Sequence, residues 1–416
     1  MNICKKGGHI MKKGISDRSL SFNTTTDILS ISTAANEDKL KFPQTINASI
    51  GVFLNDDRSI NGVDEVKKAL NKFVNNNLGY PPVLGQKIYK EAVLKWLFKD
   101  EYQNIIANYK IPFGATIGGT GALLMAFNIF ANYKDTILFP SYMWTNYLLI
   151  AHDAGLNPLT YEVFKDGHFN TDGIIEALNN TPKQENTIIV VNDPCQNPTG
   201  YTMTDEEYDE LILKLNKIGQ ERNLTVIFDI AYLDYDITDK IHRIFKKIID
   251  NKCNFLPLYT FSASKTFGLY GARVGALFAI TTDEEVDKLM VKAMGNIARG
   301  TYSCPNGPVL ASLANMLLDE ETSKLAKENI YQNSLVLNKR GEHAKKLIKQ
   351  YNINCVPYSN GFYMTLIFDD AYAIFEKLKT QHIYVVPMDE HHIRVCISSI
   401  REDEMDILFK AIGQLI

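Results

Sequence analysis

Short apolar runs alternate with longer amphipathic segments through the middle of the chain, from about residue 136 to residue 280. The runs are rich in β-branched and aromatic residues. Continuous runs of this kind are typical of strands buried on both faces, and their alternation with helices favours a largely parallel sheet. The five clearest runs are 136–139, 187–191, 225–228, 258–261 and 274–280.

Amphipathic and charge-rich segments predict helices between and after these runs. Thr204 and Glu207 have the spacing of a capping box, which predicts a helix from this point to about Gln220. A long, charge-rich segment over 309–350 also has a helical pattern. The tail predicts a separate α+β unit, in which two strand-like segments flank a helix: 361–368, 392–397 and, between them, about 371–380.

These elements predict an α/β fold with two domains. Residues 64–315 would form a large domain around the sheet, and residues 316–416 would form a small C-terminal domain. Residues 1–63 would be an N-terminal segment that joins the small domain. Because no repeat or low-complexity linker marks these borders, they depend on the pattern of elements alone.

Composition excludes several classes of function. The 416 residues carry a formal charge of −4, from 44 basic and 48 acidic side chains, so no single-sign field supports binding to nucleic acid. No apolar run approaches the roughly 20 residues that a membrane span needs. The basic, polar start of the chain at 1–17 lacks the apolar core of a secretory signal.

The cysteines and histidines predict neither a metal site nor a disulfide framework. No cysteine pair has CxxC spacing. His391 and His392 are adjacent, so they would point to opposite faces of a strand, and no third ligand is evident. We therefore expect a reduced, cytoplasmic enzyme without a metal. The six cysteines are Cys4, Cys195, Cys253, Cys304, Cys355 and Cys396.

Two glycine-containing motifs lie where ligands gather in open α/β sheets, beyond the ends of strands. Glycines in 117–124 (Ile-Gly-Gly-Thr-Gly-Ala-Leu-Leu) would let the backbone approach a ligand, and Thr120 could cap the following helix, whose N–H groups would bind an anion. This motif is neither a Walker loop nor a dinucleotide fingerprint. The second motif is Asn-Pro-Thr-Gly at 197–200. Taken singly, each is also typical of a tight turn.

Two charged residues at the ends of predicted strands are candidates for catalysis. Asp229 needs a partner there, whether a helix terminus, a cation or a ligand. Lys265 directly follows a strand, with Ser262 and Ser264 before it and Arg273 eight residues on. Hydroxyls, small residues and an arginine suited to phosphate are what a lysine needs to form a Schiff base with an aldehyde cofactor.

Together these motifs resemble those of the class I aminotransferases that use pyridoxal phosphate and have the aspartate aminotransferase fold. The resemblance runs from about Ile46 to the C-terminus. It implies a mostly parallel, seven-stranded sheet between helices, pyridoxal 5′-phosphate as cofactor, and transfer of an amino group between an amino acid and a 2-oxo acid. The motifs are Gly-Gly-Thr-Gly-Ala-Leu at 118–123, Asn-Pro-Thr-Gly at 197–200, Phe-Asp-x-Ala-Tyr at 228–232 and Ser-x-x-Lys…Gly-Leu-Tyr-x-x-Arg-Val-Gly at 262–275.

The resemblance also implies the roles of the cofactor-binding residues. Lys265 would hold the cofactor as an aldimine and then carry a proton between Cα and the cofactor. Asp229 would pair with the pyridinium nitrogen, and Asn197 and Tyr232 would hydrogen-bond the 3′ oxygen of the ring. Trp144 would stack on the ring, although a tryptophan in this pattern is also typical of a core. The phosphate would be bound by Gly119, Thr120, Ser262 and Arg273.

On the substrate side, the resemblance implies that Arg394 grips the α-carboxylate, a bidentate task that lysine would do poorly. Asn197 would contact the same group, and Gly51 would lie in the N-terminal segment that closes over the substrate. Tyr80 and Arg299 match residues that reach the site across a subunit interface. The resemblance therefore implies a homodimer with composite active sites, and Arg299 favours aspartate or glutamate as the amino donor.

Departures from the family pattern leave alternatives open. Asn192 and Tyr147 stand where the aspartate subgroup has histidines near the pyridinium aspartate, and the bulky run at 142–144 keeps an aromatic substrate as an alternative. A β-eliminating lyase on the same scaffold would use the same cofactor-binding residues. A cofactor-bound regulator is a third class, but the residues before the match lack a helix-turn-helix with a basic face.

Overall fold

The computed structural model describes residues 28–416 except 74–77, 183 and 239–241. Residues 1–17, including Cys4, lie outside the described residues. The prediction about a secretory signal depends on this segment.

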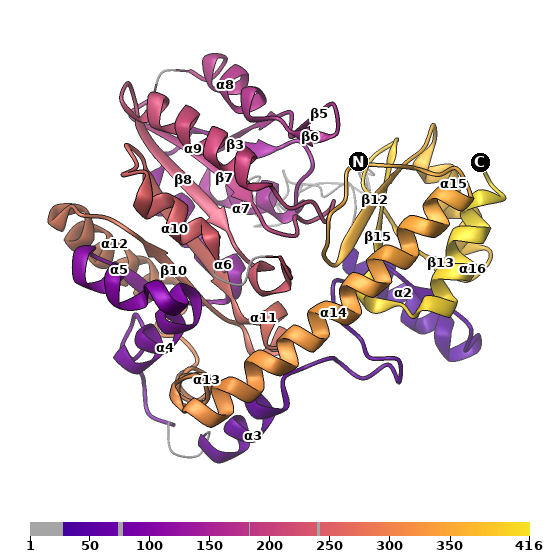
Figure 1. Cartoon of the computed structure of the whole chain (residues 1–416), viewed down its shortest axis with the longest axis horizontal. Helices are drawn as coiled ribbons and strands as arrows, with labels where there is room; N and C mark the ends of the chain where they lie inside the picture. The colour runs from indigo at the N-terminus through magenta and orange to yellow at the C-terminus, as the bar shows by residue number, and fades with distance from the viewer. Residues whose placement is uncertain (1–27, 74–77, 183, 239–241) are drawn as a thin grey trace, which may run out of the picture.

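A seven-stranded sheet forms the centre of the larger part of the molecule (Figure 1). In spatial order its strands are β2 (Phe113–Ile117), β10 (Val274–Ala279), β9 (Leu256–Ser262), β8 (Asn223–Asp229), β7 (Asn186–Asn192), β3 (Thr136–Pro140) and β4 (Asn157–Tyr161). The five strands from β9 to β4 are parallel, and β10 is antiparallel to both of its neighbours. The predicted mostly parallel sheet and its five apolar runs are confirmed.

Both faces of the large sheet are buried, because successive side chains along each strand enter different hydrophobic clusters. In β7, Ile189 and Val191 join one cluster, while Ile188 and Val190 join the other. Helices α4 (Lys87–Phe98), α9 (Asp205–Gly219), α10 (Arg243–Asp250) and α13 (Gly307–Leu318) contribute to the first cluster. The second receives α6 (Gly118–Phe130), α7 (Asn146–Ala154) and α12 (Glu284–Thr301).

Helix termini follow local capping chemistry. The Thr204 side chain accepts a hydrogen bond from the Glu207 N–H, and the Glu207 carboxylate accepts one from the Thr204 N–H, so the predicted capping box opens α9. The long helical segment at 309–350 is two helices rather than one. Asp319 has an extended backbone and caps α14 (Glu320–Gln350) through the Thr322 N–H, which separates α14 from α13.

A second, smaller α+β unit is built from the tail and the N-terminal segment (Figure 1). Its antiparallel sheet has the order β11 (Asn354–Cys355), β12 (Tyr363–Ile367), β15 (His392–Cys396) and β14 (Val386–Pro387). The N-terminal strand β1 (Ile46–Asn47) pairs in parallel with β13 (Ile383–Tyr384). Three helices complete this unit: α2 (Ile28–Lys41), α15 (Ala371–Lys379) and α16 (Glu402–Gly413).

The long helix α14 runs diagonally from the large sheet to the small unit (Figure 1). Its residue Ile330 packs in a cluster of the large sheet, whereas Leu337 packs in the cluster of the small unit.

The domain borders at 63/64 and 315/316 stay predictions. The remaining short elements are α3 (Asp64–Phe73), η2 (Lys99–Glu101), α5 (Tyr102–Asn108), β5 (Phe164–Lys165), β6 (His168–Phe169), α8 (Thr171–Asn179), η3 (Leu233–Tyr235), α11 (Ala263–Thr266), η4 (Tyr270–Ala272) and η5 (Ile397–Ser399).

In the part of the chain that the structure describes, no helix combines the length and the apolar character that crossing a bilayer requires.

Candidate active site

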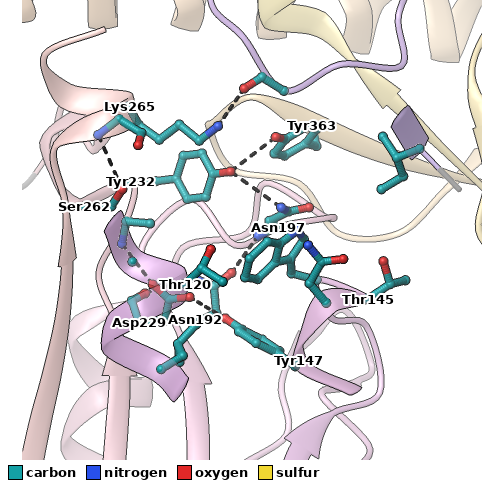
Figure 2. A pocket seen from close by; sticks show the side chains of 18 of the residues that line it. Thr120, Thr145, Tyr147, Asn192, Asn197, Asp229, Tyr232, Ser262, Lys265 and Tyr363 are labelled. Carbon is teal, nitrogen blue, oxygen red and sulfur yellow. Dashed lines mark hydrogen bonds between the residues drawn. The ribbon is translucent and has the colours of Figure 1, made fainter. Parts of the chain in front are cut away.

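A cavity of about 580 Å³ lies at the carboxyl ends of β7, β8 and β9, where the large sheet faces the small one. Figure 2 shows side chains from both sheets pointing into it. The cavity brings together all but two of the residues that the sequence assigned to the site. These are Gly51, Gly119, Thr120, Trp144, Asn197, Asp229, Tyr232, Ser262, Lys265, Arg273 and Arg394.

Lys265 sits on the single-turn helix α11, directly after β9. Its Nζ donates a hydrogen bond to the Gly51 carbonyl at 2.6 Å and lies 4.9 Å from the centre of the Tyr270 ring. Burial lowers the pKa of Lys265 to about 8, and the nearby Arg394 and Arg273 act in the same direction. The amine therefore loses its proton closer to neutral pH than an ordinary lysine does, which favours its use as a nucleophile and a base.

Asp229 is the last residue of β8 and is only 6% exposed. Tyr147 donates a hydrogen bond to Oδ2 at 2.5 Å, and Thr260 donates one to Oδ1 at 3.1 Å. Burial raises the pKa of Asp229, and these hydrogen bonds oppose that shift. No basic side chain of the described residues forms an ion pair with this carboxylate, so a cation of a ligand would supply the charge that is lacking.

The two departures from the family pattern support Asp229 in different ways. Tyr147 contacts the carboxylate itself (Figure 2). Asn192 instead donates to the backbone carbonyl of Asp229 at 2.8 Å, and its side-chain oxygen accepts from the Asn197 N–H at 2.8 Å. Asn192 therefore links the ends of β7 and β8 to the Asn-Pro-Thr-Gly turn.

A chain of polar groups crosses the middle of the cavity (Figure 2). The Tyr232 hydroxyl lies 3.2 Å from the Tyr363 hydroxyl and 3.5 Å from the Asn197 side-chain nitrogen. Burial raises the pKa of Tyr232 well above its usual value, so this hydroxyl stays protonated and can donate a hydrogen bond.

An anion cradle forms where β2 meets α6. The helix begins at Gly118, three residues earlier than a Thr120 cap would place it, so the prediction that Thr120 caps it is wrong: Thr120 lies in the first turn. No side chain caps this terminus, which leaves N–H groups available for an anion. Gly118 has a φ of +67°, and a Cβ there would lie 2.5 Å from the Arg273 guanidinium. Arg273 forms no ion pair with any described residue.

Arg394 is a buried cation, 4% exposed, on β15. Its guanidinium donates to the Ser49 carbonyl at 2.8 Å and to the Asn197 side-chain oxygen at 3.4 Å, while Nε has no partner. No carboxylate of the described chain pairs with it. Because an unpaired buried charge is costly, a carboxylate of a ligand would stabilise this guanidinium.

Trp144 precedes α7 and is half-buried at the cavity wall. Its ring lies edge-on to that of Tyr147, with centroids 5.6 Å apart and an angle of 84°. Trp144 and Asp229 line the same cavity, so a planar ligand bound there could pack against the indole.

Tyr80 and Arg299 do not line the cavity of the single chain. Tyr80 is 94% exposed, and the exposed Arg299 donates to the Ser303 hydroxyl at 2.7 Å. Their assignment to a neighbouring subunit's site stays a prediction.

Sequence reasoning missed several residues of the cavity. Tyr270 accepts a hydrogen bond from the Phe53 N–H at 2.9 Å, and its place in the Gly-Leu-Tyr motif was a signal. Tyr363 and the apolar residues Ile28 and Leu29 carried no local signal, because distant pairing brings them to the cavity. Among the described residues, no group of three histidine, cysteine or acidic side chains could hold a metal ion.

Residues 43–412 match the family described as aminotransferase class I and II. The chain belongs to this family. The mitochondrial aspartate aminotransferase of Saccharomyces cerevisiae is 28% identical over 310 residues, which cover 65% of this chain and 67% of that protein.

Solved structures of aminotransferases share the fold. The aminotransferase of Anaerococcus prevotii superimposes with a TM-score of 0.88 at 26% identity, covering 97% of this chain and 99% of that one. The aromatic-amino-acid aminotransferase of Burkholderia pseudomallei, covalently bound to pyridoxal phosphate, superimposes with a TM-score of 0.81 at 24% identity. The match covers 96% of this chain and 100% of that one. Because the family model covers residues 43–412 and the curated relative is an aspartate aminotransferase, this protein is a pyridoxal-phosphate-dependent transaminase.

The unpartnered groups of this aminotransferase fit the charges of its cofactor. Asp229 lacks a cationic partner, and the pyridinium nitrogen would provide one. The uncapped start of α6 and the nearby Arg273 suit an anion, and the phosphate would be one. Lys265 has an amine of lowered pKa that could react with the aldehyde.

Proposed function

We propose that this transaminase takes an amino acid whose α-carboxylate binds Arg394, with aspartate or glutamate as the amino donor and a 2-oxo acid as the acceptor. The observation that carries the proposal is the buried, unpaired guanidinium of Arg394 facing the cavity that holds Lys265. A bidentate carboxylate would satisfy Nε together with a second guanidinium nitrogen.

The residue roles follow from the same geometry. When bound, pyridoxal phosphate supplies an aldehyde that condenses with amines and a ring that accepts the electrons left at Cα. Asp229 would hold the proton at the ring nitrogen, and Tyr147 and Thr260 would fix the carboxylate for that task. Lys265 Nζ would take the proton from Cα and deliver it to the former aldehyde carbon of the cofactor. Tyr232 would donate a hydrogen bond to the ring oxygen.

Binding of the phosphate and ring would use groups from several elements. The N–H groups of α6 would bind the phosphate, and Trp144 would cover the ring. The side chains that would complete the phosphate site are Thr120, Ser262, Arg273 and, from a second subunit, Tyr80.

A homodimer with composite sites would bring Arg299 to the distal carboxylate of a dicarboxylic substrate. The exposure of Tyr80 and Arg299 in the single chain supports this proposal, because neither side chain is buried in its own chain. We place the enzyme in the cytoplasm, on the basis of its scattered cysteines. The five cysteines among the described residues are unpaired.

An aromatic amino acid is the second candidate substrate. Apolar side chains from α2, α6 and α7 line the outer cavity, and Leu29 on α2 is 72% exposed there. Burial of an aromatic side chain against this wall would be favourable. The relatives above include both aspartate and aromatic enzymes.

Specificity constants for aspartate and phenylalanine in wild type and Arg299→Leu separate the two candidates. We expect the substitution to lower kcat/KM for aspartate by an amount equivalent to about 2–5 kcal/mol, since it removes one partner of a desolvated charge pair. The constant for phenylalanine should hardly change. Lys292→Leu removes an exposed charge from the same helix and serves as the control. An equal loss for both substrates would mean that Arg299 does not read the side chain.

A further inference from the structure

Tyr363 enters the cavity from the small sheet and contacts both halves of the active site. It is the first residue of β12, which pairs with the strand that carries Arg394. The side chain is buried, 2% exposed, and its hydroxyl points at the Tyr232 hydroxyl, 3.2 Å away (Figure 2).

The ring of Tyr363 supports Arg394. The guanidinium carbon lies 4.5 Å from the ring centroid, within the range of a cation–π contact. Because Arg394 has no carboxylate partner in the described chain, this aromatic face is a principal electrostatic contact of the buried cation. The ring therefore helps to fix the plane in which the guanidinium meets a substrate carboxylate.

The hydroxyl of Tyr363 also determines how closely the N-terminal segment approaches. It occupies the space that a Cβ on residue 51 would fill, so only glycine fits there. The carbonyl of Gly51 accepts the hydrogen bond from Lys265 Nζ. Tyr363 thus touches the segment that holds the reactive amine.

We propose that Tyr363 is a positioning residue whose hydroxyl directs Tyr232 toward the cofactor and whose ring directs Arg394 toward the substrate. Each phenol can donate or accept. In the structure, Tyr232 donates to Tyr363 and accepts from the Asn197 side-chain amide. When the Tyr363 hydroxyl turns to donate to Tyr232 instead, the Tyr232 proton is free for the ring oxygen of the cofactor, and the network makes Tyr232 a stronger donor. This inference rests on the proposed function of Tyr232 and Arg394.

Tyr363→Phe removes the hydroxyl and keeps the ring. A donor to the ring oxygen stabilises negative charge there, so the absorption pKa of the lysine-bound cofactor should rise in the variant, by about 0.4–1 unit for one neutral hydrogen bond. Binding of the amino acid should change by less than about twofold, because the cation–π contact persists. Tyr363→Leu should show the same absorption shift and, in addition, weaken substrate binding by about 3- to 30-fold.

Tyr358→Phe is the matched control. Tyr358 is a tyrosine close by in the chain whose hydroxyl donates to the Gly361 carbonyl at 3.3 Å and which does not line the cavity. Its variant should leave the absorption pKa and substrate binding unchanged. A comparable shift in this control would mean that any lost hydroxyl in this region perturbs the cofactor, which would overturn the specific role of Tyr363.

A double-mutant cycle decides the mechanism. In a Tyr232→Phe background, Tyr363→Phe should produce no further absorption shift, because it acts through the Tyr232 hydroxyl. An unchanged absorption pKa in the single variant, or additive shifts in the double variant, would overturn the proposal. The titration is read on cofactor-loaded protein without substrate, so it reports on Tyr363 even if the proposed substrate class is wrong. Thermal unfolding of each variant verifies that it is folded.

Discussion

Three charged side chains at the cavity, Asp229, Arg273 and Arg394, have no oppositely charged partner among the described residues. Asp229 and Arg394 are buried, and a fold rarely keeps buried charges unpaired, because a desolvated charge without a partner is costly; Arg273 is exposed and does not carry this cost. The sign and place of each match one group of a cofactor–substrate complex: pyridinium, phosphate and α-carboxylate. At Asp229 and Arg394 the chain thus loses stability where it gains binding.

Lys265 is a further charge at the cavity, and the free-energy cost of burying it depends on pH. Its pKa in the cofactor-free fold is about 8, below the ordinary 10.5, so the folded state releases a proton that the unfolded state keeps. The loss of folding free energy caused by burying the charged amine is complete below pH 8 and disappears as the pH rises toward 10.5. The gain in unfolding free energy from Lys265→Met should therefore be largest near neutral pH and shrink above pH 8.

Urea unfolding of the cofactor-free proteins at several pH values measures this difference. Lys377→Met, at an exposed position, is the control for the loss of one positive charge. A stability difference that stays constant from pH 7 to pH 10 would show that the amine is not perturbed by the fold.

At the scale of elements, the sequence predicts best those strands that are buried on both faces. Runs such as 187–191 are continuous and apolar, and each lies in a central strand. The edge strand β4 was not predicted, because four of its five residues are exposed and it contains Pro158. The break between α13 and α14 was also missed, since the single residue Asp319 ends one helix and caps the next.

Site residues were predictable where a local motif carries them. Lys265 and Asp229 follow strands in sequence, so their positions at the sheet edge follow from the topology. Tyr363 and Leu29 reach the cavity only through pairing between segments far apart in the chain, as in β1 with β13. A single sequence contains no local signal for such contacts.

The junction of β2 and α6 gives a prediction at this scale. Gly118→Ala would place a methyl group against the Arg273 guanidinium and strain a backbone with positive φ. We expect weaker binding of pyridoxal phosphate, measured by fluorescence titration of the cofactor-free protein. Gly295→Ala in α12 is the control, because a Cβ there meets no atom within 4 Å. Equal affinity in Gly118→Ala and wild type would refute the cradle.

At the scale of the whole molecule, the proposed composite site predicts complementation between two inactive chains. Lys265→Ala and Arg299→Ala would each lose activity toward aspartate. In a mixed dimer, one site would receive a native Lys265 from one chain and a native Arg299 from the other. Activity should therefore return after subunit exchange, which mass spectrometry of tagged chains can verify. No recovery in verified mixed dimers would mean that each site uses its own Arg299.

The assignment of Lys265 as the cofactor lysine is the central claim of this account. Borohydride reduction of the cofactor-loaded protein, followed by proteolysis and peptide mass mapping, tests it most directly. We predict a single pyridoxyl group on the peptide that contains Lys265 and none in Lys265→Ala. A pyridoxyl group on a different lysine of the wild-type chain would contradict the assignment and the roles derived from it.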